Sequence, residues 1–74
     1  MESVGSGMIT VSVNGEARSV PKHISLEALV HLLELPQDRV AIEHNRQVVR
    51  RGYWSSVFLG DGDRVEIVHF VGGG

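Results

Sequence analysis

The chain has 74 residues, of which 42% are apolar and 22% are charged, and its formal net charge is -2 at pH 7. This length fits one small domain, and the slightly acidic balance argues against a nucleic-acid binder, which usually carries a basic patch and a high pI. The sequence has no cysteine, which excludes disulfides, thiolate metal ligands and a thiol nucleophile. No apolar run approaches the roughly 20 residues of a membrane span, and no signal peptide is recognisable, so we expect a cytoplasmic protein.

The N-terminal part of the sequence predicts an extension followed by a β-hairpin. Residues 1–7 are small and polar, and we interpret them as a disordered extension or a cloning remnant. Apolar and polar residues alternate over residues 9–13, which indicates a strand with one buried face. Asn14-Gly15 is a strong signal for a tight hairpin turn, because a type I′ turn needs positive φ at both central residues. A return strand is expected over residues 16–20, ended by Pro21, which lacks an N–H for the ladder.

A helix is predicted next, over residues 26–34. Ser25 is a favourable N-cap residue, and apolar residues follow it at helical spacing. The helix should stop before Pro36, because a residue that precedes proline avoids the α region. Its apolar stripe requires a sheet on which to pack.

The rest of the chain predicts three further strands and a capping segment. The expected elements are a strand at 40–44, a turn at Asn45-Arg46, a strand at 47–49, a short helical turn and loop at 50–59, a turn at 60–63 and a last strand at 64–71. Trp54 in the helical segment is expected to plug one end of the core. The fold class is therefore α+β, with a mixed sheet of four to five strands and one main helix on one face. We expect one domain over residues 8–71 and a flexible glycine tail over residues 72–74.

Few residue patterns suggest catalysis. The four histidines lack metal-ligand spacing, and Asp61-Gly62-Asp63 matches a plain turn better than a calcium loop, so we expect no metal site. No glycine-rich phosphate loop and no serine nucleophile motif is present. Arg46, Arg50 and Arg51 form a basic cluster, which fits either a solvated face or a docking patch for an acidic partner.

The last predicted strand suggests a docking surface. If Val65 and Ile67 point into the core, alternation places Val68 and Phe70 on the face without the helix. Together with Val71, these apolar residues are candidates for a patch that binds a partner.

The glycines at the end of the sequence suggest a reactive group. Gly72, Gly73 and Gly74 have no side chains, so they fit a channel too narrow for other residues. Ordering three residues costs on the order of 3–6 kcal/mol, which a docking surface elsewhere must offset. The chemical group offered is the carboxylate of Gly74, which becomes electrophilic when it is converted to an acyl-adenylate.

With these elements and this tail, the chain resembles the ThiS family, the sulfur carriers of thiamine biosynthesis within the ubiquitin-like β-grasp superfamily. The resemblance covers residues 8–74 and rests on five stretches: VNGE at 13–16, SLEALVHLL at 25–33, RVAIEHN at 39–45, VVRRGYW at 48–54 and DGDRVEIVHFVGGG at 61–74. The chain departs from relatives at Arg50, where proline is frequent, and at Arg46, where the turn often has glycine.

The resemblance implies a carrier with no catalytic group of its own. A ThiF-type adenylyltransferase would use ATP and magnesium to adenylate the Gly74 carboxylate. Sulfur from a cysteine-derived persulfide would replace AMP and leave a thiocarboxylate, and a ThiG-type thiazole synthase would accept that sulfur. We expect no bound cofactor, no nucleic-acid or membrane partner, and a monomer, because the same tail must reach successive partners.

Three alternatives remain open on the sequence alone. The chain fits a related β-grasp sulfur carrier, for molybdopterin or for amino-acid biosynthesis. It also fits a ubiquitin-like modifier whose Gly74 is joined to lysines of target proteins. The third alternative is a plain interaction domain with an incidental tail.

Overall fold

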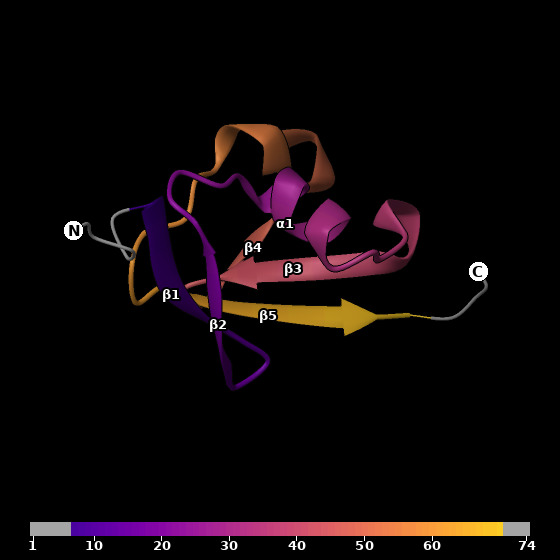
Figure 1. Cartoon of the computed structure of the whole chain (residues 1–74). Coiled ribbons are helices and arrows are strands. Elements are labelled where there is room, and N and C mark those ends of the chain that lie inside the picture. The colour runs from indigo at the N-terminus through magenta and orange to yellow at the C-terminus, as the bar shows by residue number, and fades with distance from the viewer. Residues whose placement is uncertain (1–6, 71–74) are drawn as a thin grey trace.

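The computed structural model describes residues 7–70, so most of the predicted extension (residues 1–6), Val71 and the three terminal glycines lie outside the described residues. The chain forms a five-stranded sheet with one main helix, α1, packed on one face (Figure 1). This confirms the predicted α+β class. No helix within residues 7–70 is long and apolar enough to span a membrane.

The elements follow the predicted order closely. They are β1 (Met8–Val13), β2 (Glu16–Pro21), α1 (Leu26–Leu32), a 3₁₀ turn η2 (Gln37–Arg39), β3 (Val40–His44), β4 (Gln47–Val49), a 3₁₀ helix η3 (Arg51–Ser56) and β5 (Arg64–His69). The strand β5 was predicted to continue to Val71, but its assignment ends at His69. Gly7, which we assigned to the extension, accepts a hydrogen bond at 2.9 Å from the Lys22 N–H through its carbonyl oxygen.

The sheet is mixed, and its order places β5 in the centre. The strands lie in the order β2-β1-β5-β3-β4, with β1 and β5 parallel and the other neighbours antiparallel. The chain therefore brings its last strand between its first strand and β3. This arrangement surrounds the start of β5 with ladder partners on both sides.

The helix begins where the sequence predicts and ends two residues earlier. The Ser25 hydroxyl oxygen accepts a hydrogen bond from the Ala28 N–H at 3.0 Å, which satisfies one free donor of the first turn. At the other end Glu34 adopts φ +58, and the Leu35 and Glu34 N–H groups donate to the Val30 and His31 carbonyl oxygens at 3.1 and 3.0 Å. This is a Schellman ending, which glycine usually provides. Because Glu34 takes the left-handed position, the helix stops before Pro36 has any effect.

The core lies between α1 and the covered face of the sheet. Its buried side chains are Val11, Val13, Val20, Ile24, Leu26, Leu29, Val30, Val40, Ile42, Trp54, Leu59, Val65 and Ile67. Trp54 is buried, and its indole Nε1–H donates to the Val49 carbonyl oxygen at 2.8 Å. The predicted role of Trp54 as a plug is confirmed. The neighbouring Tyr53 and Phe58 are exposed, so only part of the 50–59 segment covers the core.

Candidate functional site

The strand β5 carries the predicted site residues toward the end of the chain. Val65 and Ile67 are buried under the helix, while Val68 lies on the opposite face with 62% of its surface exposed. Phe70, the last described residue, is 48% exposed. The predicted alternation of β5 is therefore confirmed, and it leaves Val68 and Phe70 available to solvent.

Two asparagines in hairpin turns hold β5 from opposite sides. Asn14, at φ +51 in the β1–β2 turn, forms two side-chain hydrogen bonds with the backbone of Ile67. Its Oδ1 accepts from the Ile67 N–H at 2.7 Å, and its Nδ2–H donates to the Ile67 carbonyl oxygen at 3.1 Å. In the β3–β4 turn, the Asn45 Oδ1 accepts from the Arg64 N–H at 2.8 Å. Both side chains thus take the place of a ladder partner where the neighbouring strand turns away.

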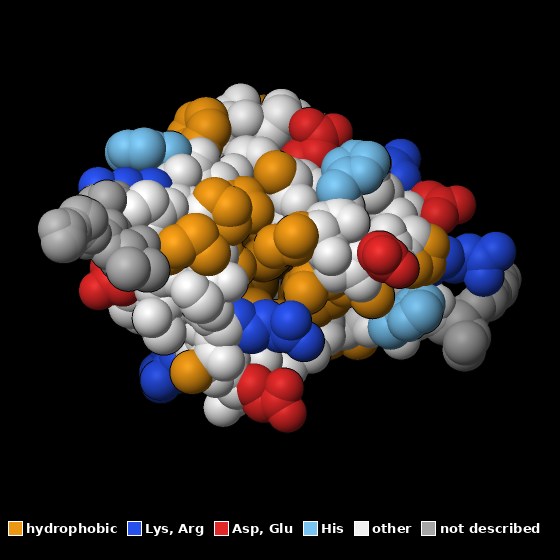
Figure 2. Space-filling view, viewed as in Figure 1, with side chains coloured by type: hydrophobic (Ala, Val, Ile, Leu, Met, Phe, Trp, Pro, Cys, Tyr) orange, Lys and Arg blue, Asp and Glu red, His pale blue; other side chains and the backbone are white. Residues whose placement is uncertain are grey.

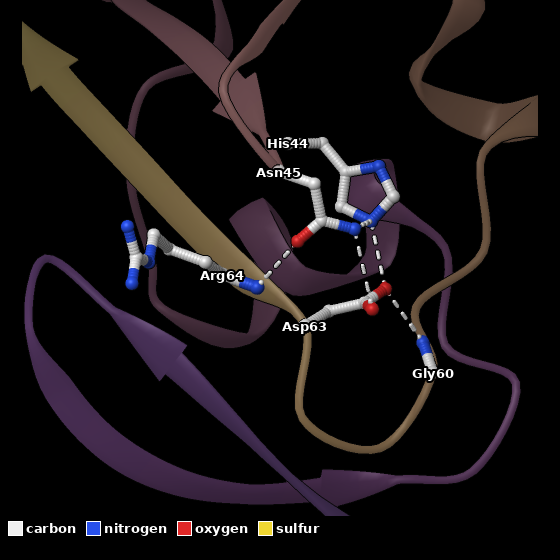
Figure 3. Close-up of polar contacts among 5 residues, drawn as sticks. All are labelled: His44, Asn45, Gly60, Asp63 and Arg64. Carbon is white, nitrogen blue, oxygen red and sulfur yellow. Dashed lines mark hydrogen bonds and ion pairs between the residues drawn. The ribbon is translucent and has the colours of Figure 1, made fainter.

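A small polar cluster fixes the start of β5, as Figure 3 shows. The Asp63 carboxylate lies 2.7 Å from the His44 Nε2 and accepts from the Gly60 N–H at 2.8 Å and the Asn45 Nδ2–H at 3.3 Å. Partial burial raises the pKa of Asp63, but the hydrogen bonds and the charge of His44 outweigh burial and hold the pKa below its usual value. The cluster ties the 60–63 turn to the end of β3.

Beyond Ile67, β5 is held on one side only within the described residues. The register of β1 against β5 ends at the pair Val13 and Val65. The register of β3 continues to Val40 and His69, and the Phe70 N–H donates to the Arg39 carbonyl oxygen at 2.9 Å. In Figure 1 the end of β5 extends past the β1–β2 hairpin toward the C-terminus, with β3 beside it.

The face of the sheet opposite α1 has a shallow groove over β3, β4 and β5. It encloses about 570 Å³ and is lined by Ala41, Ile42, Glu43, Arg46, Val48, Arg64, Glu66 and Val68. Val48, opposite Glu43 in the register, is 73% exposed. Glu43 and Glu66 are directly paired across β3 and β5. The groove therefore offers apolar contacts together with charges of both signs.

Sequence reasoning found one side of this groove and missed the other. Val68 was predicted from strand alternation, whereas Val48 was assigned to a short strand without a face. The register of β4 on β3 supplies that face, and three residues of alternation are too few to fix it from the sequence. Of the predicted basic cluster, Arg46 lines the groove, while Arg50 and Arg51 do not.

The remaining predicted residues form no reaction centre in the described part of the chain. Among residues 7–70 there is no group of three or more His, Asp or Glu side chains arranged to hold a metal ion. Val71, Gly72, Gly73 and Gly74 lie outside the described residues. The described structure thus supplies a hydrogen-bonded strand and an exposed surface that precede, in the sequence, the segment proposed to carry the chemistry.

A mixed sheet crossed by one helix, with a central last strand that precedes a triple glycine, defines a ubiquitin-like β-grasp protein. The model of the ThiS family matches residues 11–74. A crystal structure of the thiamine biosynthesis protein ThiS from Geobacter metallireducens superimposes with a TM-score of 0.78 at 30% identity, covering 89% of this chain and 100% of that one. The chain belongs to the ThiS family.

Two curated relatives differ in length. The sulfur carrier protein ThiS of Bacillus subtilis is 36% identical over 50 residues, which cover 68% of this chain and 76% of the relative. The thiazole synthase of Magnetococcus marinus is 39% identical over 64 residues, which cover 86% of this chain and 20% of the relative. The chain thus spans about a fifth of the thiazole synthase that it matches.

Proposed function

We propose that the protein is a sulfur carrier for the thiazole part of thiamine, with the carboxylate of Gly74 as the group that carries the sulfur. The observation that supports it most is the match to the ThiS family over residues 11–74, which includes the three glycines. The name of the Bacillus subtilis relative, a sulfur carrier, points the same way.

The proposed chemistry has three steps at the Gly74 carboxylate. An adenylating enzyme of the ThiF type transfers AMP from magnesium-bound ATP to a Gly74 carboxylate oxygen and releases pyrophosphate. The terminal sulfur of a cysteine-derived persulfide then attacks the carbonyl carbon, AMP leaves, and reduction of the resulting acyl disulfide by a thiol frees the thiocarboxylate. The carrier contributes no acid or base to these steps; it presents the carbon.

The described surface suits this role energetically. Threading three glycines into an enzyme costs on the order of 3–6 kcal/mol in backbone entropy. Full burial of one large apolar side chain gains about 1.5–3 kcal/mol. Val48, Val68 and Phe70 are partly exposed on the free protein, so covering all three with a partner offsets most of the cost of ordering the tail.

The choice of pathway rests on the long relatives. Two proteins named thiazole synthase, from Magnetococcus marinus and Paramagnetospirillum magneticum, contain a segment that is 39% identical to this chain. A segment joined to an enzyme in one chain is a natural partner of that enzyme when the two are separate. This favours thiazole synthase as the sulfur acceptor over an enzyme of molybdopterin or amino-acid biosynthesis.

The test is intact mass spectrometry with the adenylating enzyme of the same host, ATP, magnesium, a persulfide donor and a reducing thiol. We expect the protein mass to shift by the exchange of one oxygen for sulfur, and consumption of that form when thiazole synthase and its substrates are added. The protein without Gly73 and Gly74 is the matched control and should remain unmodified. An unmodified wild-type carboxylate, or stable adducts of Gly74 with lysines of other proteins, would contradict the proposal.

A further inference from the structure

The edge of β5 that faces β1 has hydrogen-bond partners at the start of the strand but, within residues 7–70, not at its end. Backbone groups of a strand point alternately to its two neighbours, and Val65, Ile67 and His69 point toward the β1 side. The Val65 carbonyl oxygen accepts from the Asn14 N–H at 2.9 Å, and the Asn14 side chain occupies both backbone groups of Ile67. His69 is next on this edge, and no residue of β1 is in register with it.

The other edge of β5 is occupied at the same level. Val40 of β3 is in register with His69, and the Phe70 N–H donates to the Arg39 carbonyl oxygen. The N–H and C=O of His69 are therefore directed away from β3. They form the open position of the β5 ladder closest to the end of the chain within residues 7–70.

A second groove lies beside this open position, on the helix side of the sheet. It encloses about 260 Å³ and is lined by Val13, Asn14, Glu16, Arg18, Leu33, Leu35, Ile67 and His69. Figure 2, which views the molecule from this side, shows hydrophobic side chains gathered around a hollow with charged side chains at its rim. A strand laid next to His69 would direct every second side chain into this groove.

The position of Gly74 brings a partner to this groove. Gly74 follows Phe70 by four residues, so its carboxylate lies at most about 14 Å from Phe70 even when the chain is fully extended. A protein that encloses Gly74 in a reaction centre must therefore place its own surface against the end of β5. The occupant that fits both the open ladder position and the apolar groove is an extended segment of that protein.

We propose that the partner that acts on Gly74 adds an extended apolar segment to β5 at His69, as a short extra strand in the place that β1 leaves. The His69 N–H and C=O bond to the segment's backbone, and an aliphatic side chain of the segment enters the groove at Leu33 and Leu35. Main-chain pairing of this kind fixes direction as well as affinity. It would align the tail with the partner before the glycines enter the reaction centre. This inference rests on the proposed function.

The test combines amide exchange and two variants of one residue. In the ¹⁵N-labelled full chain, saturated with the adenylating enzyme of the same host, the His69 amide should exchange at least about tenfold more slowly than in the free protein. His69→Pro removes the N–H that has no partner among residues 7–70, and proline is tolerated on an open edge. His69→Ala keeps the N–H and removes the imidazole. We expect affinity for the enzyme to fall about tenfold in the proline variant and less than about threefold in the alanine variant.

Thermal unfolding of the proline variant distinguishes a binding defect from a folding defect. The amide-exchange measurement uses the wild-type protein and so does not depend on that variant. The inference is overturned if the enzyme adenylates the wild type while the His69 amide exchanges as fast in the complex as in the free protein. It is also overturned if the folded proline variant binds as tightly as the alanine variant. Absence of adenylation in the wild type instead overturns the proposed function.

Discussion

The two parts of β5 differ in burial and in the strands that lie beside them. At Val65 the strand is buried, has β1 and β3 on its sides, and is held by Asn14 and Asn45 nearby. From Val68 onward it is exposed and has only β3 beside it among the described residues. We call residues 64–67 of β5 the anchor, and residues 68–70 the presenting half, because under the proposed function they lead to the tail. The two parts differ because side chains alternate between the faces of the sheet and because the register with β1 ends at Val65.

The largest expected effect lies beyond the presenting half. Deleting Gly73 and Gly74 should abolish thiocarboxylate formation, because the reacting carbon no longer reaches an enzyme's reaction centre. The same deletion should leave the midpoint of thermal unfolding unchanged, since the core lies elsewhere. Calorimetry and intact mass on the same sample check both statements. A substantial loss of stability would mean that the tail packs on the domain.

A pair of valine substitutions compares the halves directly. Val65→Ala should destabilise the fold by about 2–3 kcal/mol, because Val65 is 0% exposed and the change leaves a cavity. Val68→Ser should change stability by less than about 0.5 kcal/mol, since Val68 is an exposed residue. Urea unfolding measures the first difference, and affinity for the adenylating enzyme should fall only for Val68→Ser once both proteins are folded. Equal effects of the two substitutions on stability would contradict the division of β5.

Substituting Asn14 tests whether its side chain holds the end of the anchor at Ile67. Asn14→Gly suits the positive φ at this position but deletes both side-chain hydrogen bonds to Ile67. We expect a loss of about 1–2 kcal/mol in unfolding free energy and faster exchange of the Ile67 amide. Asn14→Asp retains the acceptor for the Ile67 N–H and should lose less. If the glycine variant is as stable as the wild type, the side chain of Asn14 does not hold the strand.

The smallest predicted effect concerns the stability of the fold at low pH. The pKa of Asp63 is lowered in the folded protein, so its ionised form contributes stability above its ordinary pKa of 3.8, and this contribution is lost as the pH falls through the lower folded pKa. Asp63→Asn should therefore cost about 1 kcal/mol at pH 7 and less at a pH well below 3.8. Urea unfolding at the two pH values provides the measurement. A gap that is independent of pH would show that the charge of Asp63 is irrelevant to the anchor.

Much of the fold could be predicted because local signals agreed with one another. The alternation of residues 9–13, the Asn14-Gly15 turn and the Ser25 cap each predict what is found. The end of α1 was wrong by two residues because Glu34, rather than a glycine, adopts the left-handed conformation. The Asn45-Arg46 turn was predicted correctly although Arg46 stands where relatives often have glycine. Arg46 adopts φ +74 in this turn.

The interactions that prepare the candidate site were less visible in the sequence. Asn14 was recognised as a turn residue, but its bonds to Ile67 join residues 53 positions apart and depend on the parallel pairing of β1 with β5. The contacts of Asp63 with His44 likewise arise only when β3 and β5 lie side by side. Sequence patterns reveal which faces of an element are apolar, whereas these contacts depend on how the strands are ordered.

The hydrogen bond from the Phe70 N–H to the Arg39 carbonyl oxygen fixes the last described residue beside the start of β3. Gly74 follows Phe70 by four residues, so the position of Phe70 sets how far the Gly74 carboxylate can reach. One residue inserted after Phe70 would lengthen the maximum reach of the chain to Gly74 by about 3.5 Å. Under the proposed function, we therefore expect such an insertion to impair the reaction with a partner enzyme even when every glycine is retained.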